Sequence, residues 1–157
     1  MQLYIKQKVF AMSPKFTIKD ETGEDKYFVE GEFFSLSSKM HIYNSAHEEI
    51  ALIYRKLMKF LPRFVLEVNG QQIAEIVKEV TFFKQSYTLE NTTLHVEGDF
   101  LAHEYSLFDS GRKVMDIHKE WLTWGDSYVL DILDPAYELI SLGVVLAIDT
   151  VMQSNKN

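Results

Sequence analysis

The sequence predicts a β-rich (α+β) protein: a closed or nearly closed antiparallel barrel of about twelve strands around a buried C-terminal hydrophobic helix. Three observations lead to this prediction. A strand–turn–strand unit repeats along the chain, one apolar segment lies near the C-terminus, and aromatic residues make up 13% of the sequence, with 11 Phe and 8 Tyr. Aromatic residues favour strands. A chain of 157 residues suits one domain, so we expect a single domain over residues 1–157.

The repeat is an apolar–x–apolar pair that starts a short stretch of alternating apolar and polar residues. Such alternation is typical of a half-buried strand. The first residues of successive pairs lie 24, 24, 23, 18 and 23 positions apart, and the pairs are Phe16/Ile18, Met40/Ile42, Phe64/Leu66, Tyr87/Leu89, Tyr105/Leu107 and Tyr128/Leu130.

After most pairs a polar turn leads into a second strand. The clearest turn is Asn69-Gly70, because both residues tolerate the positive φ of a type I′ hairpin turn. The second strands are expected at residues 27–29, 50–53, 73–76, 94–96 and 114–117. With an opening strand near 3–10 they make about twelve strands, and a sheet of that size usually closes because open edges invite aggregation. A β-sandwich of the same strands remains the alternative.

One segment breaks the pattern of strands. Asp134 can cap a helix and Pro135 suits a first helical position, so we expect a helix over about 135–152. Residues 139–148 are apolar nearly all round, which requires enclosure by protein or lipid. This apolar stretch is shorter than the ~20 residues that cross a bilayer, so we expect burial in the barrel and no transmembrane segment. A tail anchor or one more buried strand are the alternatives.

Composition and charge restrict the function classes. The formal net charge is −7, and an acidic chain repels nucleic acid, so we expect no nucleic-acid partner. The absence of cysteine excludes thiol nucleophiles, disulfides and thiolate metal sites. The N-terminus has no apolar run of signal-peptide length, and we expect a cytoplasmic protein.

Several short motifs carry a resemblance to a known family. They are Tyr4-Ile-Lys-Gln-Lys8, Val29-Glu-Gly-Glu-Phe-Phe-Ser35, Leu61-Pro-Arg63, Thr81-Phe-Phe-Lys84, Val96-Glu-Gly-Asp-Phe100, His103-Glu-Tyr105, Trp124-Gly-Asp-Ser-Tyr128 and Leu146-Ala-Ile-Asp149. Over nearly its whole length the chain resembles the LURP-one-related family, in particular its small bacterial members of the YxjI type, within the Tubby C-terminal and phospholipid scramblase architecture. The resemblance implies a twelve-stranded barrel around a central hydrophobic helix and no settled activity. Relatives of that fold bind phosphoinositides or act at membranes, but no motif here allows their binding residues to be transferred.

The sequence shows no catalytic or metal-binding motif. The five histidines lack metal-ligand spacing, and there is no phosphate-binding glycine loop or nucleophile elbow. His103 and Glu104 are adjacent, so on a strand their side chains face opposite ways. We therefore expect no cofactor, no metal and no enzymatic activity. Trp121 and Trp124 are expected to serve core packing and turn cover, with ligand stacking as the alternative.

One cluster departs from the acidic character of the chain. Between residues 55 and 63, four positive charges fall within nine residues that contain no acid, and Phe60 and Leu61 lie among them. Cations also precede the first strand of three successive units at a spacing of 24, which places them on one rim of a barrel. Together they form the basic rim, which comprises Lys15, Lys39, Arg55, Lys56, Lys59 and Arg63.

The basic rim leads to two hypotheses about function. In the first, the protein is a non-enzymatic binding module that uses this rim for an anionic lipid headgroup or an acidic partner. In the second, it is a protein–protein interaction scaffold that meets its partner through apolar rim surface around Trp121 and Trp124. An ordinary solvated rim without function is the plain alternative to the first hypothesis, and an enzyme ranks third.

Overall fold

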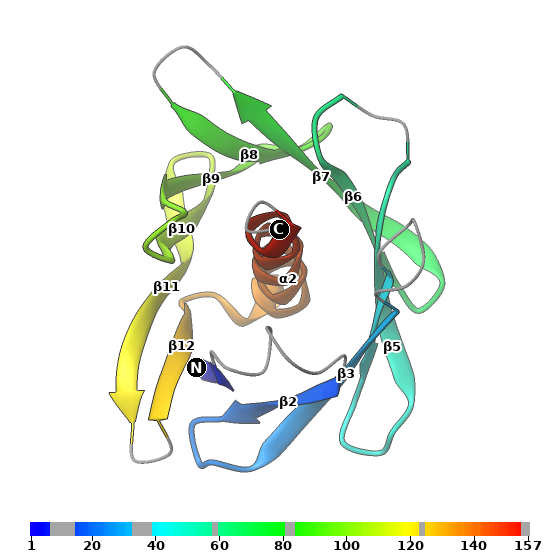
Figure 1. The fold of residues 1–157 in the computed structure, drawn as a ribbon, viewed down its shortest axis with the longest axis vertical. Coiled ribbons are helices and arrows are strands. Elements are labelled where there is room, and N and C mark those ends of the chain that lie inside the picture. The colour runs from blue at the N-terminus through cyan, green and yellow to red at the C-terminus, as the bar shows by residue number, and fades with distance from the viewer. Residues whose placement is uncertain (7–14, 33–38, 58–59, 81–83, 123–124, 155–157) are drawn as a thin grey trace.

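The computed structural model is a closed barrel of twelve antiparallel strands with one helix through its middle (Figure 1). The structure describes residues 1–6, 15–32, 39–57, 60–80, 84–122 and 125–154. The strands are β1 (Gln2–Lys6), β2 (Lys15–Asp20), β3 (Asp25–Glu32), β4 (Lys39–Tyr43), β5 (Glu49–Arg55), β6 (Arg63–Val68), β7 (Gln71–Val80), β8 (Gln85–Leu89), β9 (Leu94–Asp99), β10 (Glu104–Asp109), β11 (Arg112–Leu122) and β12 (Gly125–Ile132).

Each strand pairs with its neighbours in the chain, and the first pairs with the last. Ile5 of β1 lies opposite Tyr128 of β12, and this pairing closes the barrel. The prediction of a closed barrel of about twelve strands is therefore confirmed, and the sandwich alternative is wrong.

The alternating pattern of the sequence sets which side chains face inward. All twelve residues of the predicted apolar pairs are buried, and Ile18, Ile42, Leu66 and Leu107 are fully inaccessible. Since every second residue points to the same face of a strand, the inward positions of the barrel wall are apolar along each of these strands. The predicted hairpin turn at Asn69 and Gly70 also forms, with φ values of 50° and 79°.

The helical segment begins where the sequence predicts it. The Asp134 side chain accepts a hydrogen bond from the Ala136 N–H (3.1 Å), and a single 3-10 turn, η1 (Pro135–Tyr137), precedes the helix α2 (Glu138–Ser154). The α-helix therefore starts three residues later than Pro135, because the capped turn has 3-10 geometry.

Helix α2 fills the centre of the barrel, as Figure 1 shows. Every residue from Ser141 to Asp149 is buried, so the strands enclose the helix on all sides. By length and composition, Pro135–Ser154 would suffice to cross a membrane. Its burial among the strands accounts for the same apolar character. The central-helix prediction is confirmed, and the alternative of one more buried strand is wrong.

The barrel has two distinct ends. We call the end where β2, β4, β6, β8, β10 and β12 begin the loop rim, and the end where they finish the turn rim. The helix starts at the turn rim, since Ile132, the last residue of β12, donates its N–H to the Met1 carbonyl there (2.8 Å). Because the strand before it, β12, ends at the turn rim, α2 runs back through the barrel. Its length brings its last turns towards the loop rim.

Candidate functional site

The structure places the described residues of the basic rim at the same end of the barrel. Lys15, Lys39 and Arg63 are the first residues of β2, β4 and β6, and Arg55 is the last residue of β5. These positions all belong to the loop rim, as does Lys56, while Lys59 lies outside the described residues.

Two of these cations are neutralised by carboxylates on the outer wall. Glu75 Oε1 lies 2.8 Å from Lys56 Nζ and 3.1 Å from a guanidinium nitrogen of Arg63, which also lies 2.5 Å from Glu90. Burial acts to raise the pKa of Glu75, but hydrogen bonds from Lys56 and Arg63 outweigh it and hold that pKa below its usual value. This network joins β5, β6, β7 and the end of β8, so Lys56 and Arg63 have a structural role.

The other three described cations differ in their surroundings. Lys15 Nζ lies 3.4 Å from Glu30 in an exposed ion pair, which contributes little. The Arg55 guanidinium lies 5.9 Å from the centre of the Phe64 ring, a cation–π contact at the mouth of the barrel. Within the described part of the chain, no carboxylate oxygen lies within 4.0 Å of the charged group of Arg55 or Lys39.

Exposed apolar side chains also gather at the loop rim. Phe60 is fully exposed (102%), and Leu57, Val80 and Leu101 are 51%, 54% and 81% exposed. They lie in or beside the connections β5–β6, β7–β8 and β9–β10, which are neighbours around the barrel. We call these four residues the apolar arc.

The sequence indicates only part of the apolar arc. Phe60 stands out because it lies among basic residues, whereas the sequence around Val80 and Leu101 has no pattern that distinguishes them from core residues. The two other large hydrophobic residues exposed in the described structure, Ile73 and Leu133, lie near the turn rim. The side chains of Trp121 and Trp124, which motivated the scaffold hypothesis, lie outside the described residues.

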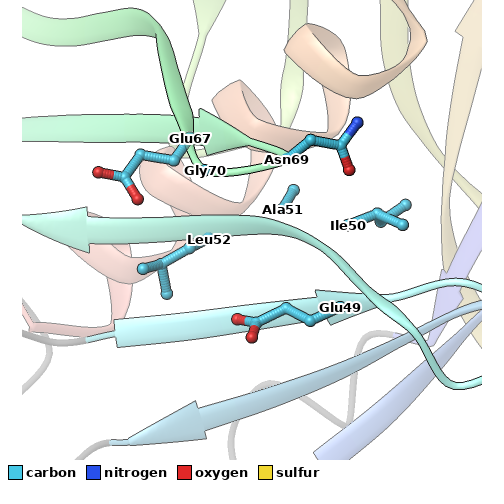
Figure 2. A pocket seen from close by; sticks show the side chains of 7 residues that line it. All are labelled: Glu49, Ile50, Ala51, Leu52, Glu67, Asn69 and Gly70. Atoms are coloured by element: carbon cyan, nitrogen blue, oxygen red, sulfur yellow. The ribbon is translucent and has the colours of Figure 1, made fainter.

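Two shallow hollows lie on the outer wall, and Lys15 of the basic rim lines the larger of them. One, of about 220 Å³, is shown in Figure 2, where Leu52 of β5 lies beside its cross-strand partner Glu67 of β6. The other, of about 380 Å³, is lined by β2, β3 and β4 and contains the stacked rings of Phe28 and His47 (4.5 Å between centroids). The first hollow has two acids and no cation or nucleophile among its lining residues, so it offers no catalytic arrangement.

Comparisons with known proteins agree with the barrel fold. The model of the LURP-one-related family matches residues 1–149. The uncharacterized protein YxjI of Bacillus subtilis (strain 168) is 32% identical over all of this chain and 97% of its own length. The chain belongs to the LURP-one-related family. The X-ray structure of an Arabidopsis thaliana protein superposes on it with a TM-score of 0.62, covering 96% of this chain and 90% of that one at 14% identity, which supports the fold alone.

The titratable groups of this LURP-one-related protein form no recognisable catalytic constellation in the part that the structure describes. No group of three or more His, Asp or Glu residues there could hold a metal ion. His41 is held on the outer wall by Glu49 (2.5 Å) and Glu32 (3.1 Å). Burial acts to lower the pKa of His41, but its hydrogen bonds to both glutamates prevail and raise that pKa.

His103 differs from its expected setting. It lies in the turn between β9 and β10 with a φ of 56°, and its side chain is buried, whereas Glu104 begins β10 and is exposed. The two side chains do point apart, as predicted, but the cause is a left-handed turn residue and not strand alternation. Its nearest acid in the described structure is Asp149 of α2, 46 positions away in the sequence (149 − 103).

Proposed function

We propose that this protein is a non-enzymatic binding module whose loop rim associates weakly and reversibly with an anionic lipid surface. The observation that carries the proposal is the coincidence of the apolar arc with cations at one end of the barrel. Exposed apolar side chains that gather beside cations are the arrangement that interfacial membrane binding uses. A rim with cations alone would be an ordinary solvated surface.

The energy available to this rim fits weak association. Burying one Leu or Phe side chain that was exposed contributes about 1.5–3 kcal/mol, and each cation near an anionic leaflet contributes about 1 kcal/mol. Arg55 and Lys39 are the main electrostatic contributors, because Lys56 and Arg63 are already neutralised by Glu75 and Glu90.

Part of the acidic net charge lies away from an anionic surface in this orientation, whereas Glu32, Asp99 and Glu104 lie at the loop rim itself. The β2–β3 turn at residues 20–25 carries four acids and lies at the turn rim. Screening limits the reach of those charges to about 8–10 Å at physiological salt. The acidic turn rim therefore points away from an anionic surface when the loop rim meets it.

Co-sedimentation with vesicles tests the apolar part of the proposal. The vesicles contain phosphatidylcholine with or without an anionic phospholipid, and the variant Phe60→Ser/Leu101→Ser removes the two most exposed side chains of the apolar arc. Leu133→Ser is the matched control, because Leu133 is 57% exposed at the turn rim. We expect the double variant to lose most of the bound fraction and Leu133→Ser to bind like wild type.

The charge contribution needs its own pair of variants. Lys39→Glu reverses a charge at the loop rim, and Lys113→Glu does so near the turn rim, at the second residue of β11. We expect Lys39→Glu to weaken binding at low salt and Lys113→Glu to leave it unchanged. If wild type does not bind anionic vesicles at low salt, or if both controls bind as poorly as the loop-rim variants, the proposal is wrong. An apolar protein partner at the apolar arc is then the remaining hypothesis.

A further inference from the structure

Three buried polar side chains lie inside the barrel, towards the last turns of α2. Asp149 of the helix is 5% exposed, His103 of the β9–β10 turn is 7% exposed, and Tyr105 of β10 is 2% exposed. We call these three residues the interior polar cluster. They come from three different elements, and none belongs to the basic rim or to the apolar arc.

The hydrogen-bonding groups of the interior polar cluster are not satisfied by one another. Asp149 Oδ1 lies 3.6 Å from His103 Nε2, which is too long for a direct hydrogen bond. Both ring nitrogens of His103 and the Tyr105 hydroxyl are buried and have no hydrogen-bond partner among the described residues. Buried polar groups in native proteins are nearly always paired, because an unpaired one costs about 1–3 kcal/mol.

The imidazole ring is fixed where it lies. It stacks on Tyr128 with 4.5 Å between the ring centroids and an interplanar angle of 23°. Tyr128 is itself buried on β12. This stack restrains the position of the His103 ring in the barrel.

The chemistry of the cluster specifies what can complete it. Burial, and then the nearby charge of Asp149, raise the pKa of Tyr105 well above its usual value, so the phenol keeps its proton and donates. Carboxylate oxygens accept hydrogen bonds, and the ring nitrogens of an imidazole can donate or accept them. A molecule that both donates and accepts is needed, and water is the smallest one.

We propose that the interior polar cluster is a binding site for one ordered water molecule, which accepts from Tyr105 and donates to Asp149, and which His103 also contacts. A buried water with two to four polar partners is a regular part of protein structure. The bridge ties the last turns of α2 to the β9–β10 turn. This inference is independent of lipid binding.

Thermal melts of conservative variants test the site, because a fall or a rise in Tm distinguishes a bound water from its absence. If water satisfies the Tyr105 hydroxyl, Tyr105→Phe leaves that water with one partner fewer, and we expect the Tm to fall by roughly 3–6 °C. The control is Ser141→Ala on the same helix, whose buried hydroxyl also has no hydrogen-bond partner among the described residues. We expect the Tm of Ser141→Ala to stay the same or rise.

A crystal structure of the full chain at high resolution provides the second readout. We expect density for one water within hydrogen-bond distance of Tyr105 Oη and of Asp149 in the wild type, and its loss or displacement in Tyr105→Phe. A direct His103–Asp149 hydrogen bond with no water density, or a Tm that rises in Tyr105→Phe as in Ser141→Ala, would overturn the proposal.

Discussion

The substitution Val145→Asp tests whether the barrel depends on its central helix. Val145 is 2% exposed in the middle of α2, and its neighbours Val144 and Leu146 are fully inaccessible. An aspartate there would have its carboxyl group buried, because residues 141–149 are buried on every side of the helix. We expect the variant to be unfolded, or close to it, at neutral pH.

The magnitude follows from burial. A fully buried carboxyl has its pKa raised by up to about 3–5 units. At neutral pH the loss is about 4 kcal/mol, because a native carboxyl whose pKa exceeds the pH takes up a proton, and only the roughly 3 units between pH 7 and the ordinary aspartate pKa count, at about 1.36 kcal/mol each. Removing the Val145 side chain loses a further ~1.5 kcal/mol of apolar burial. The sum of about 5–6 kcal/mol is comparable to the whole free energy of unfolding of a marginally stable domain, for which the usual range is about 5–15 kcal/mol.

Urea unfolding followed by circular dichroism measures the effect. Val80→Asp is the matched control, because Val80 is 54% exposed at the end of β7, and we expect a change within about 0.5 kcal/mol. The loss in Val145→Asp grows as the pH rises from below the ordinary aspartate pKa, since only the charged carboxylate resists burial. If Val145→Asp unfolds at the same urea concentration as wild type, α2 does not occupy the core.

Two further predictions concern the barrel wall. Gly98 has a φ of +144°, and a Cβ there would lie 2.5 Å from the backbone of β10, so we expect Gly98→Ala to lower the free energy of unfolding by more than the about 1–3 kcal/mol of backbone strain alone. Gly111→Ala is the control, because Gly111 lies in a turn with open space around it, and we expect a smaller loss there. Equal urea midpoints for the two variants would contradict this. Burial acts to lower the pKa of His41, but hydrogen bonds to Glu49 and Glu32 outweigh it and raise that pKa above 6.5. We therefore expect wild type to be more stable than His41→Asn below pH 6.5, and this extra stability to be lost as the pH rises through the raised pKa. Thermal melts of both proteins across this pH range measure the difference in their Tm. A difference that does not change with pH would exclude the ion pairs of His41 as its source.

Much of the fold was predictable because its determinants are local. Alternation at Phe16 and Ile18, or at Met40 and Ile42, specifies which face of a strand is apolar, and Asn69-Gly70 specifies a turn without reference to distant residues. The start of the helical segment at Asp134 is equally local. Closure of the barrel followed from the number of strands.

The contacts that decide the candidate site are not local. Arg63 meets Glu75 and Glu90, which are 12 and 27 positions away (75 − 63 and 90 − 63), and the pattern of the sequence does not specify this pairing. The sequence therefore predicts that these cations share one rim, as its described members do, but it does not predict their partial neutralisation. His103 meets Asp149 only because the helix passes inside the β9–β10 turn, which needs the whole fold.

The absence of cysteine allows one direct measurement of the proposed orientation at a lipid surface. A single cysteine is introduced by Phe60→Cys at the loop rim or by Leu133→Cys at the turn rim, and each is labelled with an environment-sensitive fluorophore. On addition of anionic vesicles at low salt, the account predicts a blue shift and a gain of intensity for the label at position 60, and no change for the label at position 133. No change at either position, or the larger change at position 133, would contradict the account.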